Sequence, residues 1–357
     1  MKHFIPLISI LCLMCNNNST ISGNNKPDGD GETNMPGDSI SNEYIRGVDL
    51  SYVNQVLDFG GVYRNEDGNK VNPYAFFSDK GANYVRLRLW HTPDWTRELS
   101  GTQQYNDIED VKLAAQRVKE QEMNILLDFH YSDFWADPER QLIPDAWQNI
   151  KDLETLKDSV FKYTLNTMEE LAAEDLMPKM VQIGNETNCG MMYTEAPEAF
   201  PALNVCNGHW QNMGEVLNSA IRAIRKASQA EGAEIKIALH IAQPENVEWW
   251  VQNIMSQGKV NDFEIVGFSY YAPWSEVPIT DIKDYIKRFR QQFDKEIIIL
   301  ETAYSWTLNN TDNYNNIFNA ESDEPGYPQT PQGQQEYMID LTRFVLEGEG
   351  TGVFYWE

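Results

Sequence analysis

Two glutamates stand at the ends of apolar segments and could act together in chemistry. Glu186 closes the segment Met180–Glu186, whose apolar start gives way to the polar pair Asn185 and Glu186. Glu301 closes the apolar segment Glu296–Glu301 far downstream, so the two carboxylates cannot form a local helical pair. Both segments have the character of buried strands in a parallel sheet. If both belong to one parallel barrel, the carboxylates meet at its mouth, an arrangement suited to cleavage of a glycosidic bond.

The two carboxylates would take different roles. Acetal cleavage needs a proton for the leaving oxygen and a base or nucleophile at the anomeric carbon, and we assign these roles to Glu186 and Glu301 respectively. The nucleophile must stay ionised, so it needs cationic or hydrogen-bond donor neighbours. Suitable residues are Arg86 and one of Tyr270 and Tyr271. The charge of the nucleophile would help the acid to keep its proton. The plain alternative is that either glutamate is a strand-end residue in water.

A second group of inward-facing side chains is predicted from the segment Tyr84–Trp90. The segment alternates strictly, which puts Arg86, Arg88 and Trp90 on one face and three apolar residues on the other. An unpaired buried charge is costly, so two arginines inside a barrel need carboxylate partners.

Further polar and aromatic residues follow the predicted strands. Asn185 could hold a sugar hydroxyl beside the reacting carbon. His130 and His240 are each either donors near the catalytic pair or satisfied structural histidines. Trp90, Trp274 and Trp356 are candidate stacking platforms for pyranose rings, although each alone could be core packing. The predicted supporting set is Asp49, Arg86, Arg88, Trp90, Asp128, His130, Tyr131, Asn185, His240, Tyr270, Tyr271, Trp274 and Trp356.

Eight short apolar segments alternate with amphipathic ones. The expected strands are Ile45–Leu50, Tyr84–Trp90, Asn124–Phe129, Met180–Glu186, Lys236–Leu239, Ile265–Ser269, Glu296–Glu301 and Gly352–Trp356. The expected helices are Asp107–Glu120, Leu153–Glu174, Trp210–Glu231, Pro244–Gln257, Ile279–Phe293 and Gln332–Leu346. This order predicts an α/β fold, a (β/α)8 TIM barrel forming a single catalytic domain. The rival doubly wound sheet usually carries a glycine-rich phosphate loop, and no G-x-G-x-x-G or Walker motif occurs.

The charge of the chain restricts its partners. The 357 residues include 54 acidic and 28 basic ones, for a net charge of −26. This disfavours nucleic acid, anionic membrane surfaces and polyanionic substrates, and it suits a neutral substrate. We expect the chain to act as a monomer.

The first residues have the pattern of an export signal. A basic start precedes the apolar run Phe4–Met14, which is too short to span a membrane. Cys15 follows directly, as in a bacterial lipoprotein signal, where it would be lipidated; plain secretion is the alternative. We therefore divide the chain into an export signal at 1–15, a disordered polar tether at 16–43 and the catalytic domain at 44–357. The expected location is the outer membrane or cell surface, otherwise the medium or periplasm, and a lipid at Cys15 would be the only membrane contact.

Cysteines and metals leave alternatives open. Cys189 and Cys206 flank one loop and are either a disulfide or two free thiols. A metal hydrolase could use His130, His240, Asp49 and Asp128, but no H-x-H or H-E-x-x-H spacing occurs. No cofactor is expected for catalysis. The loop Leu308–Ile317 is dense in oxygen ligands and is either a structural Ca2+ site, with Asp312 and Asn316 as ligands, or a solvated loop.

Six blocks together resemble glycoside hydrolase family 53, the endo-β-1,4-galactanases. They are Gly47–Asp49, Val85–Trp90, Asp128–Pro138, Ile183–Glu186, Glu301–Tyr304 and Gly352–Glu357, and the likeness runs from about Tyr44 to the last residue. The third block, D-F-H-Y-S-D-F-W-A-D-P, is the most specific, whereas N-E alone is common to many barrel glycosidases.

The resemblance implies a retaining endo-hydrolase of β-1,4-galactan, the side chain of pectic arabinogalactan. It implies Glu186 as acid/base and Glu301 as nucleophile. Some bacterial members carry Ca2+ in the loop after the seventh strand, but Tyr314 stands where a histidine ligand is expected. It also implies a further C-terminal segment beyond Glu357. Two other functions remain open: a retaining mannanase or xylanase, and a glycan-binding barrel without catalysis.

Overall fold

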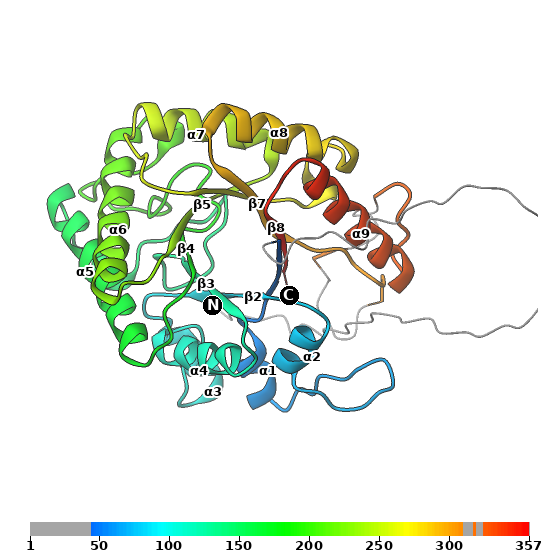
Figure 1. Ribbon diagram of the computed structural model, residues 1–357. Helices are drawn as coiled ribbons and strands as arrows, with labels where there is room; N and C mark the ends of the chain where they lie inside the picture. Colours follow the sequence, from blue (N-terminus) through cyan, green and yellow to red (C-terminus); the bar gives the residue numbers. More distant parts are fainter. Residues whose placement is uncertain (1–43, 310–316, 319–323, 357) are drawn as a thin grey trace, which may run out of the picture.

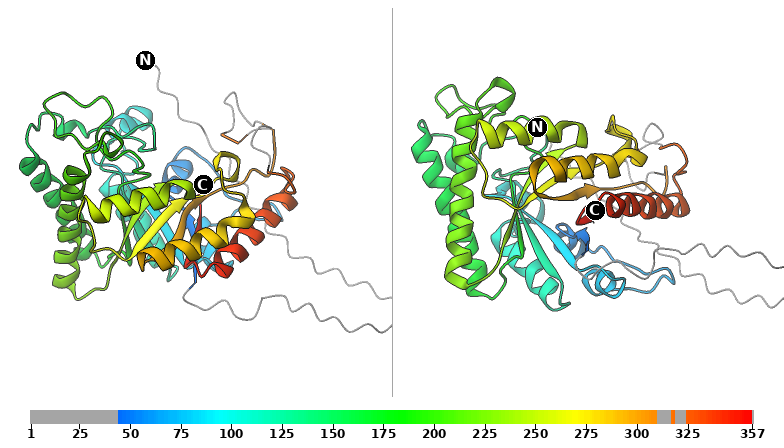
Figure 2. Two further views of the ribbon diagram at one scale, coloured as in Figure 1. Left: turned by 90° about the horizontal axis from the view of Figure 1, so that it is seen from above. Right: turned by 45° about the horizontal axis from the view of Figure 1, so that its top comes forward.

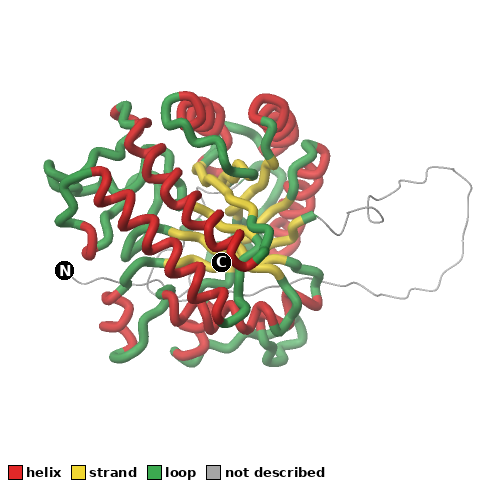
Figure 3. The backbone as a smooth tube through the Cα atoms, turned by 60° about the vertical axis from the view of Figure 1, so that its left-hand side comes forward, coloured by secondary structure: helices red, strands yellow, loops and turns green. Residues whose placement is uncertain are grey.

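The protein is a closed barrel of eight parallel strands in sequence order, ringed by helices (Figures 1 and 3). The computed structural model describes residues 44–309, 317–318 and 324–356. The strands are β1 (Ile45–Asp49), β2 (Tyr84–Leu89), β3 (Asn124–Phe129), β4 (Met180–Ile183), β5 (Lys236–Ala242), β6 (Ile265–Ser269), β7 (Glu296–Thr302) and β8 (Gly352–Tyr355). All eight predicted strands are present, and the predicted TIM barrel is confirmed.

The helices form the outer layer. They are α1 (Val53–Asp58), α2 (Pro73–Asp79), α3 (Asp94–Ser100), α4 (Ile108–Lys119), α5 (Leu153–Ala173), α6 (Trp210–Glu231), α7 (Pro244–Ser256), α8 (Ile282–Phe293) and α9 (Pro331–Glu347). The six predicted helices agree with α4 to α9, except that Ile279–Asp281 is a separate 3-10 turn before α8. The predicted cap of α4 is also present, because the Asp107 side chain accepts from the Asp110 N–H. Helices α1 to α3 were missed because six or seven residues are too few to show a helical period.

Two helices on one side of the barrel, α5 and α6, are the longest and lie against each other (Figures 1 and 2). Their buried residues join the large apolar layer between strands and helices. Burial of this layer stabilises the barrel wall and fixes which face of each strand points inward. Among the described helices, none is long and apolar enough to cross a membrane.

The barrel interior changes character along the strands. Its base is a small apolar cluster that includes Leu126 of β3, Met180 of β4 and Ala238 of β5. Two residues further along the same strands, the inward positions are Asp128, Gln182 and His240, all buried. Because inward residues recur at every second position, each of these three strands carries an apolar side chain at the base and a polar one at the mouth.

Strand β4 ends earlier than predicted, at Ile183. Gly184 has φ +78°, and a Cβ added there would lie 2.6 Å from the sulfur of Met191. Only glycine fits such a position without strain. Glu186 also has a positive φ, of 46°. The chain therefore leaves the sheet in a tight turn that carries Asn185 and Glu186 over the mouth, while β5 continues three residues beyond its predicted end.

The loop after β4 carries the cysteine pair. Cys189 and Cys206 form a disulfide with a Cα–Cα distance of 5.0 Å, so the disulfide alternative is the one present in the structure. The predictions for Cys15 and the segments 1–15 and 16–43 lie outside the described residues, as do Asp312, Tyr314 and Asn316.

Candidate active site

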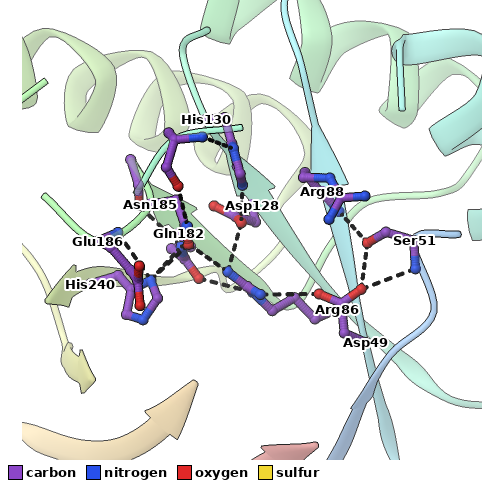
Figure 4. Close-up of polar contacts among 12 residues, drawn as sticks. Asp49, Ser51, Arg86, Arg88, Asp128, His130, Gln182, Asn185, Glu186 and His240 are labelled. Carbon is purple, nitrogen blue, oxygen red and sulfur yellow. Dashed lines mark hydrogen bonds and ion pairs between the residues drawn. The ribbon is translucent and has the colours of Figure 1, made fainter. Parts of the chain in front are cut away.

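Arg86 of β2 is the centre of the polar layer at the mouth (Figure 4). Its Nη1 lies 3.0 Å from Asp49 Oδ2, and its Nη2 lies 2.7 Å from Asp128 Oδ2 and 2.8 Å from Glu301 Oε1. The guanidinium is 2% exposed. Three carboxylates from β1, β3 and β7 thus surround one buried cation, and the prediction that Arg86 needs carboxylate partners is confirmed.

Glu301 near the end of β7 has a donor on each of its two carboxylate oxygens. Besides Arg86, the hydroxyl of Tyr271 donates to Glu301 Oε2 at 3.0 Å. The pKa of Glu301 is raised, mainly by burial, and the adjacent Arg86 cation limits the rise. Two donors on two different oxygens favour the carboxylate, which is the form that a nucleophile requires.

Of the two candidate tyrosines, only Tyr271 reaches Glu301. Tyr270 points away from the mouth, is fully buried, and donates its hydroxyl to the backbone oxygen of Val277 at 2.9 Å. Its prediction as a site residue is wrong. Successive residues leaving a strand point to opposite sides, so Ser269 and Tyr271 face inward and Tyr270 faces outward.

Glu186 has a different environment. It is partly exposed, and its one described side-chain partner is Ser269, whose hydroxyl donates to Oε1 at 2.5 Å. Burial of the carboxyl and the nearby negative charge of Glu301 raise the pKa of Glu186 to about 8. The pair therefore shares one proton at neutral pH, and the proton lies on Glu186, because Arg86 stabilises the charge on Glu301.

Asn185 is fixed from both ends of its amide. Its Oδ1 accepts from Arg86 Nη2 at 2.8 Å, and its Nδ2 donates to the backbone oxygen of Ala136 at 2.8 Å. Gln182, which the sequence reasoning missed, donates from Nε2 to Asn185 Oδ1 and accepts from Arg86 Nε. The signal for Gln182 was present, since it is the inward position next along β4 after Met180.

The two histidines are held inside the polar layer. His130 Nδ1 accepts from the Ala136 N–H at 3.3 Å, so its Nε2 carries the proton and donates to Asp128 Oδ2 at 3.0 Å. Burial lowers the pKa of His130, which keeps the ring neutral. His240 of β5 contacts Asn185 Oδ1 at 2.9 Å and Ser269 Oγ at 3.0 Å. His130 is thus a satisfied structural histidine, whereas His240 contacts the backbone N–H of Glu186 and the hydroxyl that donates to its carboxyl.

Arg88 differs from the prediction. No carboxylate in the described part of the chain pairs with it, although it is 2% exposed. Its guanidinium lies 4.6 Å from the Tyr52 ring, 4.7 Å from the Trp90 ring and 3.9 Å from the Trp135 ring. Aromatic faces attract a cation and take the place of the expected carboxylates.

Two further predicted residues do not line the mouth. Trp90 is 1% exposed and packs on Arg88, so its prediction as a sugar platform is wrong. Tyr131 is equally buried, points into the layer outside the barrel, and bonds to the Thr164 hydroxyl at 2.8 Å. Tyr131 follows the inward residue His130, so strand alternation already placed it on the outer side.

The remaining predicted aromatics are accessible. Trp274 is 49% exposed and Trp356 is partly exposed. Tyr271 lies 5.3 Å from Trp274 and 6.5 Å from Trp356 between ring centroids, so these rings continue outward from Glu301. Trp135, which was not predicted, lies 6.1 Å from Trp356 on the other side. An apolar wall of this kind can bind the faces of sugar rings.

Metal ligands are not brought together in the described ranges, where no three His, Cys, Asp or Glu side chains form a group suited to a metal ion. Asp49 and Asp128 instead bind Arg86, and the two histidines bind side chains of the same layer. The candidate Ca2+ ligands Asp312 and Asn316 lie outside the described residues, so that site stays an expectation.

Comparisons with known proteins agree with this geometry. Residues 45–357 match the model of "Glycosyl hydrolase family 53". An arabinogalactan endo-beta-1,4-galactanase of Cellvibrio japonicus is 41% identical over 311 residues, covering 87% of this chain and 79% of the relative. Among solved structures, the family 53 catalytic domain of Ignisphaera aggregans is 30% identical with a TM-score of 0.78, covering 90% of this chain and 86% of that one. A fungal beta-1,4-galactanase is 28% identical with a TM-score of 0.75, covering 88% and 89%.

The match covers the whole barrel, including the strands that carry Arg86 and Glu301 and the turn that carries Glu186. From its sequence and its structure, the chain belongs to glycosyl hydrolase family 53.

Proposed function

We propose that this glycoside hydrolase cleaves internal β-1,4-galactosidic bonds of galactan, including the side chains of type I arabinogalactan, with retention of configuration. The observation that carries the proposal is the unlike environment of two neighbouring carboxyls. Glu301 lies against a cation and a hydroxyl donor, whereas Glu186 is held protonated by burial and by the charge of Glu301. The name of the Cellvibrio japonicus relative supports galactan as the substrate.

In the first step, Glu186 donates its proton to the glycosidic oxygen while a carboxylate oxygen of Glu301 attacks the anomeric carbon. The bond to the leaving chain breaks, and that chain departs as an alcohol. Arg86 and Tyr271 position the attacking carboxylate and keep it ionised until the bond forms. Asn185, fixed by Arg86 and Ala136, lies beside the acid and is suited to hold a sugar hydroxyl near the reacting carbon.

In the second step, Glu186 is a carboxylate and takes a proton from water. The water oxygen bonds to the anomeric carbon, and Glu301 leaves with the electron pair of the ester bond. Two displacements at one carbon restore the original configuration. The role of Glu186 reverses between the steps, so its pKa must allow both forms near the working pH.

The surroundings of the site suit a neutral polysaccharide. The chain carries a net charge of −26, which repels polyanions. The exposed rings near the mouth offer stacking surfaces beyond one sugar unit. A retaining mannanase or xylanase would use the same carboxyls, and a glycan-binding barrel would need the rings but not the proton-sharing pair.

The test is digestion of linear β-1,4-galactan, with β-1,4-mannan and xylan in parallel, by wild type and Glu301→Gln. We expect short galacto-oligosaccharides from internal cuts by the wild type alone, with the β anomer as the first product by proton NMR. Products only from mannan or xylan would show that this glycan is the substrate. An α anomer as the first product would refute retention. Galactan binding without products would favour the glycan-binding alternative.

We also propose that the protein is exported and anchored through a lipid on Cys15. The supporting observation is the basic and apolar start followed by this cysteine. Metabolic labelling with a fatty acid, compared between wild type and Cys15→Ser, tests the anchor; label on both would refute it.

A structural Ca2+ at Asp312 and Asn316 is tested by the change in melting temperature on adding a chelator, which Asp312→Ala should abolish.

A further inference from the structure

The side chain that touches the acid Glu186 is itself held in one orientation by a histidine. Ser269, at the end of β6, is fully buried, and its hydroxyl oxygen lies 2.5 Å from Glu186 Oε1 and 3.0 Å from His240 Nε2. Two strands and a turn therefore contribute to one short chain of contacts: His240 from β5, Ser269 from β6, and Glu186 from the turn after β4.

The direction of these hydrogen bonds follows from the backbone. Two donors face His240 Nδ1, namely the Glu186 N–H at 3.3 Å and Gln182 Nε2 at 3.0 Å. Asn185 Oδ1 lies 2.9 Å from the same nitrogen but already accepts from Arg86 and Gln182, so Nδ1 acts as the acceptor. A neutral imidazole then carries its one proton on Nε2, and that proton is donated to Ser269 Oγ. Burial lowers the pKa of His240 well below its usual value, which keeps the ring neutral. The hydroxyl hydrogen of Ser269 is left to point at Glu186.

We propose that Ser269, oriented by His240, is a dedicated hydrogen-bond donor that stabilises the ionised form of Glu186 and so serves the second step of the reaction. Ser269 and His240 are positioning residues here, because neither touches the reacting atoms. The inference rests on the proposed acid/base role of Glu186.

The second step is where such a donor matters most. In the free enzyme, burial and the charge of Glu301 keep Glu186 protonated, as the first step requires. Once Glu301 has become an ester its charge is gone, and Glu186, whose proton has passed to the leaving chain, must remain ionised in a partly buried site. A hydroxyl that donates to the carboxylate lowers the cost of that ionisation, since a hydrogen bond to the charged form favours it.

Other charged and titratable groups also face Glu186. Glu301 and Asp137 raise its pKa, and Arg86 lowers it. The hydroxyl of Tyr271 lies close enough to be affected by the charge of Glu186. These groups remain in place when Ser269 is changed, so a difference between wild type and a Ser269 variant reports the hydroxyl alone.

The experiment compares wild type, Ser269→Ala and Ser269→Thr, with Ser219→Ala as the matched control. Ser219 is a buried serine of α6 whose hydroxyl binds Arg222, away from the site. Two substrates separate the steps: linear β-1,4-galactan, whose leaving group needs a proton, and dinitrophenyl β-galactobioside, whose leaving group does not.

Two results are expected for Ser269→Ala. The basic limb of kcat/KM on galactan moves up by about one pH unit, because loss of a charged hydrogen bond of ordinary strength raises the pKa of Glu186 by that amount. The steady rate on the dinitrophenyl substrate falls about 10-fold at pH 6, while the initial burst of dinitrophenol stays near one per enzyme. Ser269→Thr, which keeps a hydroxyl, restores both, and Ser219→Ala changes neither.

An unmoved basic limb, or an equal fall of burst and steady rate, would overturn the role of Ser269. Wild type that turns over neither substrate would instead refute the proposed function. If the melting temperature of Ser269→Ala differs from that of Ser219→Ala, Ser269→Cys is used in its place. The weaker thiol donor then predicts a smaller shift in the same direction, and no shift again refutes the role.

Discussion

Arg86 and Arg88 lie two residues apart on β2, face the same way and are equally buried, yet their surroundings differ completely. Arg86 contacts the carboxylates of Asp49, Asp128 and Glu301, whereas Arg88 lies among the rings of Tyr52, Trp90 and Trp135. A buried guanidinium can be stabilised by charge or by aromatic faces. Only the first arrangement includes a carboxylate that can react. The side of the mouth around Arg86 is therefore the reactive side, and the aromatic side around Arg88 is the supporting side.

The largest effect is expected at Glu301, the carboxylate beside Arg86 that is proposed to react. Glu301→Ala removes the proposed nucleophile and should lower kcat on galactan by about 10^4-fold or more, because no covalent intermediate can form. Glu186→Ala should also lower kcat on galactan by orders of magnitude. Circular dichroism should show both variants folded. Near wild-type turnover by either variant would show that its assigned role is wrong.

Removing the cation itself should damage the fold as well as the reaction. Arg86→Ala leaves several buried carboxylates without their shared partner, so we expect the free energy of unfolding to fall by about 3–5 kcal/mol. Urea denaturation at pH 7 measures the change. Because the carboxylates become neutral when protonated, the loss should shrink as the pH is lowered towards 4. A loss that is the same at both pH values would contradict the ionic account.

The matched change on the aromatic side should be milder. Arg88→Met keeps an apolar chain among the three rings and strands no carboxylate, so we expect a loss of about 1–2 kcal/mol from the cation–aromatic contacts. The turnover number on galactan should stay within about 10-fold of wild type. If Arg88→Met instead abolished turnover while remaining folded, the division into a reactive side and a supporting side would be wrong.

The smallest effect concerns the proton on Glu186. The pKa of Glu186 is about 8 in the folded protein, above that of an exposed carboxyl. The group therefore lowers the free energy of unfolding as the pH rises from its pKa in the unfolded chain towards 8. Glu186→Gln is neutral in both states and should raise the free energy of unfolding by about 1–2 kcal/mol at pH 7 and by little at pH 4.

The control for this change is Glu231→Gln, the same substitution at the exposed end of α6. A stabilisation by Glu186→Gln at pH 4 as large as at pH 7 would show that the proton is not its cause.

Much of this comparison could be predicted from the sequence. The alternation in β2 placed both arginines inside, and the tips of β4 and β7 identified both glutamates. Alternation would also have separated Tyr271 from Tyr270 and excluded Tyr131. The prediction confines the alternation to the strands and therefore misplaces these residues, which follow the strand ends.

The partners of Arg88 could not be predicted in the same way. Trp135 lies in a loop, where no residue period operates, and it reaches Arg88 only through the path of that loop across the mouth. The turn at Gly184 could not be predicted either, because a positive φ is a property of the folded backbone and a glycine in the sequence does not by itself indicate one.

The first strand has a consequence for how the enzyme is presented. Since β1 enters the barrel at Ile45, beside Gly352 of β8, the chain that precedes it joins the body at the base, on the face opposite the catalytic mouth. A lipid anchor at Cys15, as proposed, would attach the molecule through this base. The catalytic mouth would then face away from the surface that carries the anchor, towards polysaccharide chains in the surroundings.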